Sequence, residues 1–537
     1  MSKVLFRNGV MWPGVAGQPT FDGLLIEDEK IIAVGEAALA SDHDEVVDLK
    51  GKFLMPSFAD GHAHPLFGGR AAYGPNIAEL RTIDEILKEV GRYAAANPDQ
   101  EWIIGGPYEA SLEPKGEFDA HWLDSVVSDR PVVLHAMDYH TIWVNSEALR
   151  RCNVTADTED MEIGTIVRRA DGSPLGTLRE WDAVDLILDH APARSLESEI
   201  KALKYACERY ARSGLTWWQD AWVDRGMAEA YLAAEEAGVL SLGVNLGFRA
   251  DPRTWQEDLP YFLEQRKLIE SSAKNKNLTA RTVKFFSDGV FEGGTAALLE
   301  PYDDNPCYHG MPVWDVVNLT AAVTACDAAG FQVHIHAIGD AGIRQALDAI
   351  EHAIKVNKAW DRRPVIAHVQ LVDPADFHRF KELGILANFG PLWTCLDGMQ
   401  AVLSAPRMGE VRASRQYQMR SLIEDGVTLT FGSDWPVTSE IPLLGLPVAV
   451  HRQTPERYPE GGWIPHEAIT MEQALEAYTA NVAKQGFMEH EMGTLEAGKF
   501  ADFILLPHNP LSMDPHDVSS MSVLKTYRKG KVLYSGE

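Results

Sequence analysis

Cysteine is scarce in this chain. Only five cysteines occur in 537 residues, an odd number, and no two of them form a C-x-x-C pair. A disulfide framework needs an even set of regularly spaced cysteines. The sequence therefore argues against such a framework and predicts small buried thiols in a reducing compartment, at Cys152, Cys207, Cys307, Cys326 and Cys395.

Long apolar runs and dense basic runs are also missing. The longest apolar stretch, residues 441–450, is about half of a bilayer span and contains two prolines. Residues 1–12 meet polar side chains too early for a secretory signal. Lys and Arg total 49 against 78 Asp and Glu, a net charge of -29 that repels nucleic acid and anionic membranes. We expect a cytoplasmic protein that acts on a small-molecule substrate and binds neither nucleic acid nor a membrane. Whether it forms a homodimer stays open.

The composition itself supports a large folded core. Hydrophobic residues make up 45% of the chain and charged residues 24%, which is ordinary for a globular protein. The length allows about two to four domains, although a barrel fold can take about 250 residues or more as one unit.

Both ends of the chain read as short strands joined by turns, a pattern that predicts hairpins. Since chain termini often lie close together, the two ends are predicted to form one sheet-rich domain from residues 1–57 and 488–537. The apolar runs are residues 4–6, 23–26 and 31–35 near the N-terminus, with turns at 7–9 and 27–30, and residues 501–506, 523–527 and 532–534 near the C-terminus, with a turn at 529–530.

The middle of the chain alternates helices with short apolar strands. Gly330, Gly384 and Gly426 stand where a glycine ends a helix before the next strand. This alternation is typical of a parallel sheet or (β/α)8 barrel, predicted over residues 58–487 with an inserted subdomain at about 70–194 after the first barrel strand. The predicted helices are 196–213, 316–329 and 341–356, and the predicted strands are 282–286, 332–336, 365–368, 385–389 and 427–431.

The first central strand, residues 53–64, ends in the His62-Ala63-His64 triplet. Residues two apart in an extended segment face the same side, so both imidazoles project together. Two neutral imidazoles a few ångströms apart suit a borderline divalent ion such as zinc. Alone, the pair is a weak signal, because a histidine near a strand is more often a core residue.

Later strands also end in polar residues, at the position where barrel enzymes place their catalytic groups. A lysine inside an apolar strand is hard to explain otherwise, because burying an unpaired ammonium is unfavourable. A shared metal centre explains all of these groups at once. They are Lys284 in V-K-F-F-S-D-G, His334 and His336 in V-H-I-H-A-I-G-D, His368 in I-A-H-V-Q and Asp434 in F-G-S-D-W-P.

The order H-x-H, Lys, His, His, Asp resembles the amidohydrolase superfamily, and the phrases around these residues resemble its YtcJ-like branch, the amidohydrolase 3 family, which includes N-substituted formamide deformylases. The likeness runs from Val4 to Tyr534. Its motifs are P-S-F-A-D-G-H-A-H, V-K-F-F-S-D-G-V-F-E-G-G-T-A-A-L-L-E-P-Y, H-A-I-G-D, G-S-D-W-P and M-G-T-L-E-A-G-K-F-A-D-F-I-L-L.

The resemblance implies an α/β fold, a distorted (β/α)8 TIM barrel with a composite β-sandwich from both chain ends and an insertion after barrel strand 1. It also implies one or two divalent ions, zinc being expected. Lys284 would bridge them as a carboxylated lysine; if it stays an amine, one ion is the better interpretation. The ligands implied are His62, His64 and Asp434 for the first ion, and His336 and His368 for the second.

Other positions have open roles. His334 shares a strand face with His336, and we interpret it as a core residue or a partner of a ligand. His140, in the segment Y-H-T-I-W-V-N-S, and Glu180, in G-T-L-R-E, resemble family segments near the pocket. Together with Trp435 they are predicted to bind substrate, although a loop histidine and a packed tryptophan are alternatives.

The predicted function is hydrolysis of a C–N bond in an amide, with an N-substituted formamide as one candidate. Asp434 and His368 are the predicted catalytic residues: Asp434 accepts a proton from the attacking water and returns it to the leaving nitrogen. The same site acting on a cyclic amide, a carbamate or an ester, or as a deaminase, stays open. A binding or regulatory protein on a decayed hydrolase fold is the weaker alternative, because no expected ligand is missing.

Overall fold

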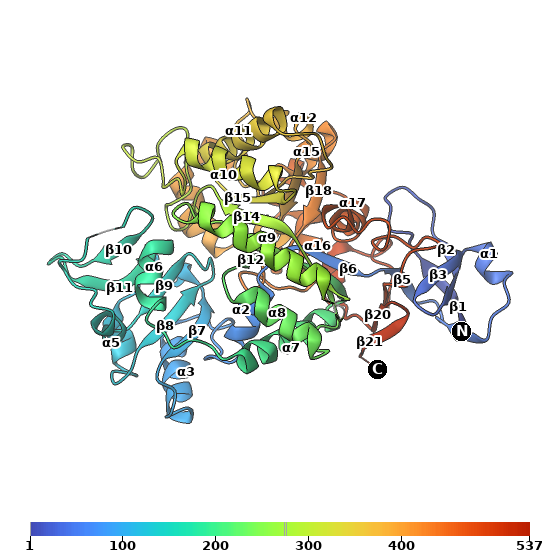
Figure 1. The fold of residues 1–537 in the computed structure, drawn as a ribbon, viewed down its shortest axis with the longest axis horizontal. Helices are drawn as coiled ribbons and strands as arrows, with labels where there is room; N and C mark the ends of the chain where they lie inside the picture. Colours follow the sequence, from blue (N-terminus) through green and yellow to red (C-terminus); the bar gives the residue numbers. More distant parts are fainter. Residues whose placement is uncertain (1, 160, 273, 275, 537) are drawn as a thin grey trace.

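The computed structural model of the chain describes residues 2–159, 161–272, 274 and 276–536. Three sheets organise them, and Figure 1 shows these sheets in a row. A five-stranded sheet lies at one end, a parallel eight-stranded sheet in the middle, and a sheet that contains strands from both termini at the other end. The predicted fold class, a barrel with a composite sandwich and an insertion, is confirmed.

The central sheet is a nearly closed barrel in which each strand pairs in parallel with the next. The strands predicted from their apolar runs are all present, with bounds that differ by a few residues at most. In chain order the barrel strands are β6 (Phe58–Ala63), β12 (Leu215–Val223), β13 (Gly243–Arg249), β14 (Leu278–Phe286), β15 (Gln332–Ala337), β16 (Val365–His368), β17 (Leu386–Phe389) and β18 (Thr428–Phe431).

Helices follow most barrel strands and cover the outside of the barrel (Figure 1). Gly330, Gly384 and Gly426 have φ angles of 73°, 66° and 90°, the left-handed region in which a glycine ends a helix, as predicted. The main helices are α7 (Leu196–Arg212), α8 (Met227–Glu236), α9 (Trp255–Ser271), α10 (Val316–Ala328), α11 (Asp340–Val356), α12 (Arg379–Glu382), α15 (Met419–Asp425), α16 (Pro442–His451), α17 (Met471–Ala477) and α18 (Ala480–Gln485).

Backbone hydrogen bonds join the last barrel strand to the first at its carboxyl end. The Asp434 amide donates to the His62 carbonyl at 2.8 Å, and the His64 amide donates to the Trp435 carbonyl at 2.7 Å. The segment after β18 is thus hydrogen-bonded to the segment at the end of β6. The A-D-G-H-A-H and G-S-D-W-P motifs, which are far apart in the chain, meet at this seam.

The chain ends form one mixed sheet around an apolar cluster that includes Phe6, Leu54 and Phe503. Strands from the N-terminus and the C-terminus pair directly, Leu54 opposite Leu505. The strands are β1 (Lys3–Met11), β2 (Phe21–Glu27), β3 (Lys30–Val34), β4 (Glu45–Asp48), β5 (Phe53–Pro56), β19 (Phe503–Leu506), β20 (Lys525–Arg528) and β21 (Lys531–Ser535).

Two local predictions in this region are wrong. The turn predicted at residues 7–9 is instead part of β1, where Asn8 takes a φ of 59° and the register with β2 shifts between Arg7 and Met11. Asparagine tolerates this conformation, so a bulge replaces the turn. The single strand predicted for residues 53–64 is two strands, β5 in the terminal sheet and β6 in the barrel, because the continuous apolar run hides the break at Ser57.

The inserted segment carries its own five-stranded sheet, in the order β10-β11-β9-β8-β7. From this strand pairing we propose the predicted division into domains: residues 1–57 with 488–537 form the terminal domain, and residues 58–487 form the barrel. The inserted subdomain spans about residues 70–194. Its elements are α3 (Ile83–Ala96), β7 (Ile103–Tyr108), β8 (Val132–Ala136), β9 (Thr141–Val144), α5 (Ser146–Arg151), β10 (Thr165–Arg168), β11 (Pro174–Arg179) and α6 (Trp181–Leu188).

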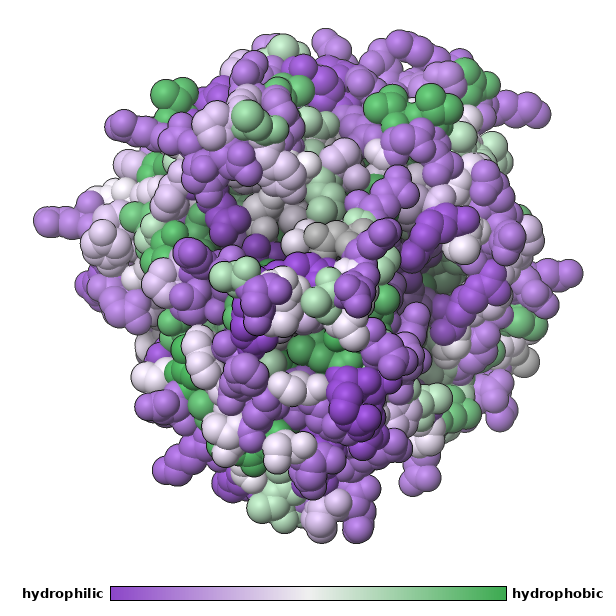
Figure 2. Space-filling view, turned by 90° about the vertical axis from the view of Figure 1, so that its left-hand side faces the viewer, coloured by the Kyte–Doolittle hydropathy of each residue, from purple (hydrophilic) through white to green (hydrophobic). Residues whose placement is uncertain are grey.

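The surface on this side of the molecule is mainly hydrophilic, with small scattered hydrophobic patches (Figure 2). No helix among the described residues is long and apolar enough to cross a membrane.

Candidate active site

The parallel register brings the predicted ligands to one end of the barrel. Phe286 of β14 pairs with His336 of β15, and Ala337 pairs with His368 of β16. Carboxyl ends of parallel strands meet at the same edge, so their side chains converge there. All the predicted ligands are buried, with exposed fractions from 0% for Lys284 to 7% for His64.

Three of these side chains form a compact group. The Nε2 atoms of His62 and His64 lie 3.5 Å and 3.0 Å from the same Oδ1 of Asp434. Ligands of a tetrahedral zinc ion at about 2.0–2.1 Å stand about 3.3 Å apart, so this spacing fits one ion. One ligand atom from each of these three residues lies within 4.8 Å of the other two, and all three residues are buried.

The other predicted ligands lie beside this group. The Nζ of Lys284 is 3.3 Å from the Nε2 of His62, and the rings of His336 and His368 are 4.6 Å apart between centroids. The Nε2 of His336 lies 3.1 Å from the Gly289 carbonyl oxygen. Since a carbonyl only accepts, that nitrogen carries the proton and Nδ1 keeps the lone pair that a metal takes.

The donor set fits a divalent metal. Burial lowers the pKa of His62, His336 and His368, the last to about 3, so these imidazoles are neutral, the form that binds metal. Burial likewise lowers the pKa of Lys284 to about 7. Among the described residues no carboxylate lies within ion-pair distance of its Nζ, which meets only the His62 nitrogen and, at 4.4 Å, the Phe286 ring. A buried amine without a carboxylate in direct contact is what a metal-bridging lysine explains.

Further buried contacts hold the ligands in place. Asp60 accepts hydrogen bonds from the amides of His62 and Ser433, at 3.2 Å and 2.9 Å, and from the Tyr210 hydroxyl at 2.9 Å. It therefore ties the first ligand strand to the loop of Asp434. His334 does not face an open ligand position: its Nε2 lies 2.8 Å from the Nδ1 of His62, where it orients that ring.

His140 and Glu180 meet at the edge of the ligand group. The Nδ1 of His140 lies 2.9 Å from the Oε2 of Glu180, and the other oxygen of Glu180 accepts from the Thr295 hydroxyl. The His140 ring is 5.2 Å from the ring of His336. Burial opposes protonation of His140, but the charge and hydrogen bond of Glu180 outweigh it and raise the pKa of His140 to about 9. Glu180 has a φ of 63°, which is a strained backbone conformation for a residue other than glycine. Such strain is found mainly at functional sites.

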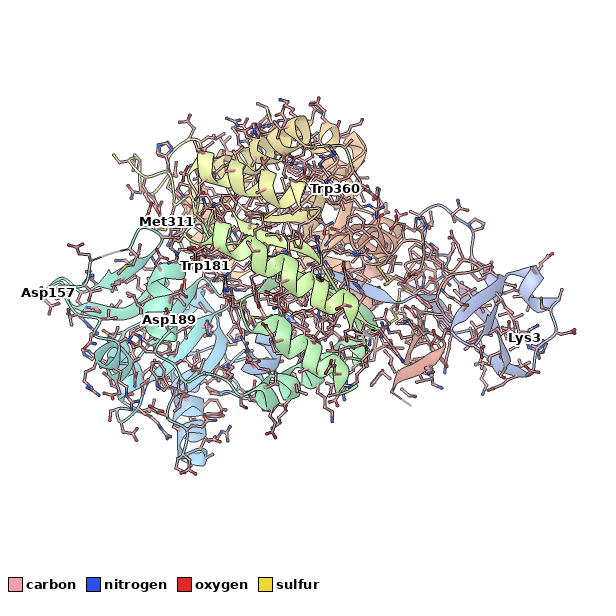
Figure 3. The ribbon with its side chains drawn as sticks, viewed as in Figure 1. Lys3, Asp157, Trp181, Asp189, Met311 and Trp360 are labelled. Atoms are coloured by element: carbon pink, nitrogen blue, oxygen red, sulfur yellow. The ribbon has the colours of Figure 1, made fainter. Side chains whose placement is uncertain are left out.

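An aromatic wall of four rings, Phe67, Trp181, Trp222 and Phe286, lies against the ligands. The centroids of Trp181 and Trp222 are 4.4 Å apart, and those of Trp181 and Phe286 are 4.6 Å apart. Phe67 stacks on His64 at 5.9 Å. Figure 3 places Trp181 where the inserted subdomain meets the barrel, so the wall joins side chains from both parts.

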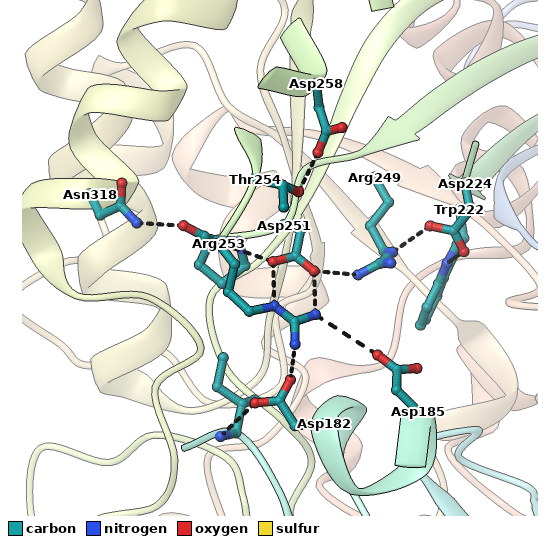
Figure 4. Close-up of polar contacts among 12 residues, drawn as sticks. Asp182, Asp185, Trp222, Asp224, Arg249, Asp251, Arg253, Thr254, Asp258 and Asn318 are labelled. Atoms are coloured by element: carbon teal, nitrogen blue, oxygen red, sulfur yellow. Dashed lines mark hydrogen bonds and ion pairs between the residues drawn. The ribbon is translucent and has the colours of Figure 1, made fainter. Parts of the chain in front are cut away.

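A polar network holds this wall from behind (Figure 4). The indole N–H of Trp222 donates to Asp224 at 2.7 Å, and Arg249 donates to the other oxygen of Asp224 at 2.6 Å. Arg253, on the next barrel loop, donates to Asp182 of α6 at 2.5 Å. The contact between Arg253 and Asp182 crosses from the barrel to the inserted subdomain.

The cavity in front of the ligands has a volume of about 1450 Å³. It is lined by the predicted ligands apart from Lys284, by His140 and Glu180, and by the aromatic wall. Trp435, predicted to bind substrate, is not among the residues that line this cavity, and its indole packs against Gly68 and Tyr210. Trp393, stacked on His368 at 4.9 Å, does line it.

Several of these residues escaped the sequence analysis. Asp60 lies two residues before His62 in the A-D-G-H-A-H motif, and that position within a motif was the available signal. Thr295 likewise lies in a quoted motif, V-K-F-F-S-D-G-V-F-E-G-G-T. Phe67, Trp181 and Trp222 come from separate elements with no local pattern, so nothing in the sequence pointed to the wall.

Comparison with known proteins defines the class. A model of the amidohydrolase family matches residues 45–534, so the chain belongs to that family and is a hydrolase. The family implies a divalent metal. A crystal structure of an uncharacterised metal-dependent hydrolase from Pyrococcus furiosus matches with a TM-score of 0.72 and 25% identity, over 95% of this chain and 100% of that one.

Curated relatives match along almost the whole chain. The Arabidopsis thaliana protein LONG AFTER FAR-RED 3 is 32% identical over 99% of this chain and 92% of its own length. The putative amidohydrolase YtcJ of Bacillus subtilis is 28% identical over 99% of both chains. The N-substituted formamide deformylase of Arthrobacter pascens is 26% identical over 95% of this chain and 94% of its own.

Proposed function

We propose that this chain hydrolyses a C–N amide bond at a zinc-type centre held by His62, His64, Lys284, His336, His368 and Asp434. The observation that carries the proposal is the compact group of His62, His64 and Asp434, next to the buried amine of Lys284. Its likeness to an N-substituted formamide deformylase makes such formamides the first substrates to try. A decayed, non-catalytic site is disfavoured because the donor set is intact.

Each side chain has a distinct part in this reaction. A divalent ion bound there would acidify a water molecule and polarise the substrate carbonyl. Asp434 is placed to accept the proton of the attacking water and to return it to the leaving nitrogen. The amide is thereby split into a carboxylic acid and an amine. His368 would bind the metal, and the indole of Trp393, stacked on the His368 ring, fixes the orientation of that ring.

Carboxylation of Lys284 would supply the missing negative charge. The reaction needs a neutral amine, which attacks CO₂ and releases one proton. A pKa of about 7 leaves much of Lys284 neutral at ordinary pH. The resulting carbamate would offer two oxygen ligands in place of one buried cation.

Glu180→Gln is expected to lower kcat about 10- to 100-fold, because Glu180 orients His140 beside the ligands. The glutamine keeps the size of the side chain, so metal content and melting temperature should change little. We expect KM to change less than kcat, which a general loss of folding would not produce. Unchanged kcat would show that the hydrogen bond between His140 and Glu180 is not needed for turnover.

A hydrolysis screen tests the proposed function. Purified, metal-loaded protein is incubated with formamides, other amides, lactams, carbamates, esters and amino-heterocycles, and product formation is measured. We expect cleavage of amides, with aryl-substituted ones favoured because the aromatic wall offers flat apolar contacts. Trp222→Ala should then raise KM for aryl amides more than for small alkyl amides.

Two results would contradict the proposal. One is cleavage confined to esters or deamination of heterocycles, which would keep the metal site and change the reaction. The other is no turnover of any class by protein that carries its metal, which would favour a binding role.

A further inference from the structure

A second, smaller cavity lies outside the catalytic one, between the inserted sheet and the barrel loops. Its volume is about 190 Å³. Side chains from both parts of the molecule line it, so whatever occupies it touches both. Among them are Thr165 and Arg179 from the inserted sheet, and Thr295, Asp304, Tyr308 and Arg407 from the barrel side.

Two guanidinium groups line this cavity without a carboxylate partner. Among the described residues, no Asp or Glu oxygen lies within 4.0 Å of a nitrogen of Arg179 or Arg407. Among the described residues, Arg179 donates to the main-chain oxygens of Lys115 at 3.0 Å and Gly116 at 3.4 Å. Asp304 also lines the cavity, but in the described part of the chain no ion pair joins it to either arginine.

Some other arginines, such as Arg452, also donate to main-chain oxygens without an ion pair among the described residues. Acidic residues outnumber basic ones by 78 to 49, and other partly buried arginines do find a carboxylate, such as Arg70 with Glu199 and Arg362 with Asp327. Burial and the charge of Arg407 both lower the pKa of Arg179. The two cations therefore repel each other in a partly dehydrated space, and an anion between them would turn that repulsion into attraction.

We propose that this cavity binds a small oxyanion, a carboxylate or a phosphate, between Arg179 and Arg407. Guanidinium forks match the paired oxygens of both groups. Gly294 lies beside one of these arginines: it has a φ of +73°, and a Cβ there would lie 2.4 Å from a guanidinium nitrogen of Arg407. Only glycine lets that guanidinium lie where it does. The bound anion bridges β11 of the inserted subdomain to α13 (Ala405–Met408) on the barrel side.

Inorganic phosphate and acetate are the probes, measured by calorimetric titration and by thermal unfolding of the full, metal-loaded chain. We expect at least one of them to bind and to raise the melting temperature. Arg179→Gln and Arg407→Gln should each weaken that binding at least about tenfold, since each removes one charged fork. Arg420→Gln is the matched control, because Arg420 pairs with Glu424 on the surface and should leave binding unchanged.

Phosphate binding at the metal centre is distinguished by the same variants. Binding of wild-type strength in both Arg179→Gln and Arg407→Gln would place the anion elsewhere and overturn the proposal, as would the absence of binding by both probes. If Arg407→Gln does not fold, Arg407→Lys takes its place, because lysine keeps the positive charge but not the forked guanidinium. It should weaken anion binding, and an unchanged affinity would contradict the proposed fork. Asp304→Asn removes a negative charge and should leave affinity equal or higher; a loss would contradict the site. None of these results depends on the amide hydrolysis.

Discussion

Replacing Asp434 by Asn is expected to lower kcat by about a thousandfold or more, because it removes the base that accepts the proton of the attacking water. Burial opposes ionisation of Asp434, but hydrogen bonds from His62 and His64 hold its pKa well below the usual value. The carboxylate is therefore charged and ready to accept a proton throughout the neutral range. Steady-state rates on the best substrate of the screen measure the effect.

The control for Asp434→Asn is a measurement that its fold is unchanged. An asparagine side chain has nearly the same shape as the aspartate it replaces, and the backbone bond from the Asp434 amide to the His62 carbonyl does not involve the side chain. Far-UV circular dichroism should therefore match wild type. If metal-loaded Asp434→Asn keeps an activity within tenfold of wild type, Asp434 is not the group that accepts the proton.

Replacing Lys284 by Ala has the second largest expected effect. Since Lys284 lies 3.3 Å from His62 and has no carboxylate within ion-pair distance among the described residues, we expect the variant to retain at most one ion and to lose activity by about a hundredfold or more. Added short carboxylates such as acetate should restore part of it, because they supply the oxygen ligands of the carboxylated side chain.

A spectroscopic measurement separates this role from a packing role. Wild-type protein in ¹³C-labelled bicarbonate should give a carbamate signal in its ¹³C NMR spectrum, and Lys284→Ala should not. Lys284→Met fills the same space without the amine, so recovery of activity in that variant would show that packing alone was lost. Full activity of Lys284→Ala with two bound ions would contradict the bridging role.

The regular parts of the molecule followed from the sequence because their signals are local. Apolar runs with a glycine before them predicted the barrel strands, and polar residues at their ends predicted the ligands that the parallel register brings together. The break at Ser57 was missed because β5 and β6 form one apolar run, yet belong to different sheets.

Long-range packing accounts for what the sequence did not show. Phe67, Trp181 and Trp222 lie far apart in the chain, and Trp181 meets Trp222 only because the inserted subdomain packs on the barrel. Trp435 was predicted to bind substrate, but it lies in the turn after β18, and its indole packs on Tyr210. The pairing of Glu180 with Thr295 depends on the same packing.

The most direct test of metal-dependent hydrolysis is one measurement of metal content and turnover on the same sample. Purified protein is analysed for divalent ions, stripped with a chelator, assayed on the best substrate of the screen, and assayed again after zinc is returned. We predict one to two ions per chain, loss of activity with the ions, and recovery with zinc. Full activity of protein that carries no metal would contradict the account.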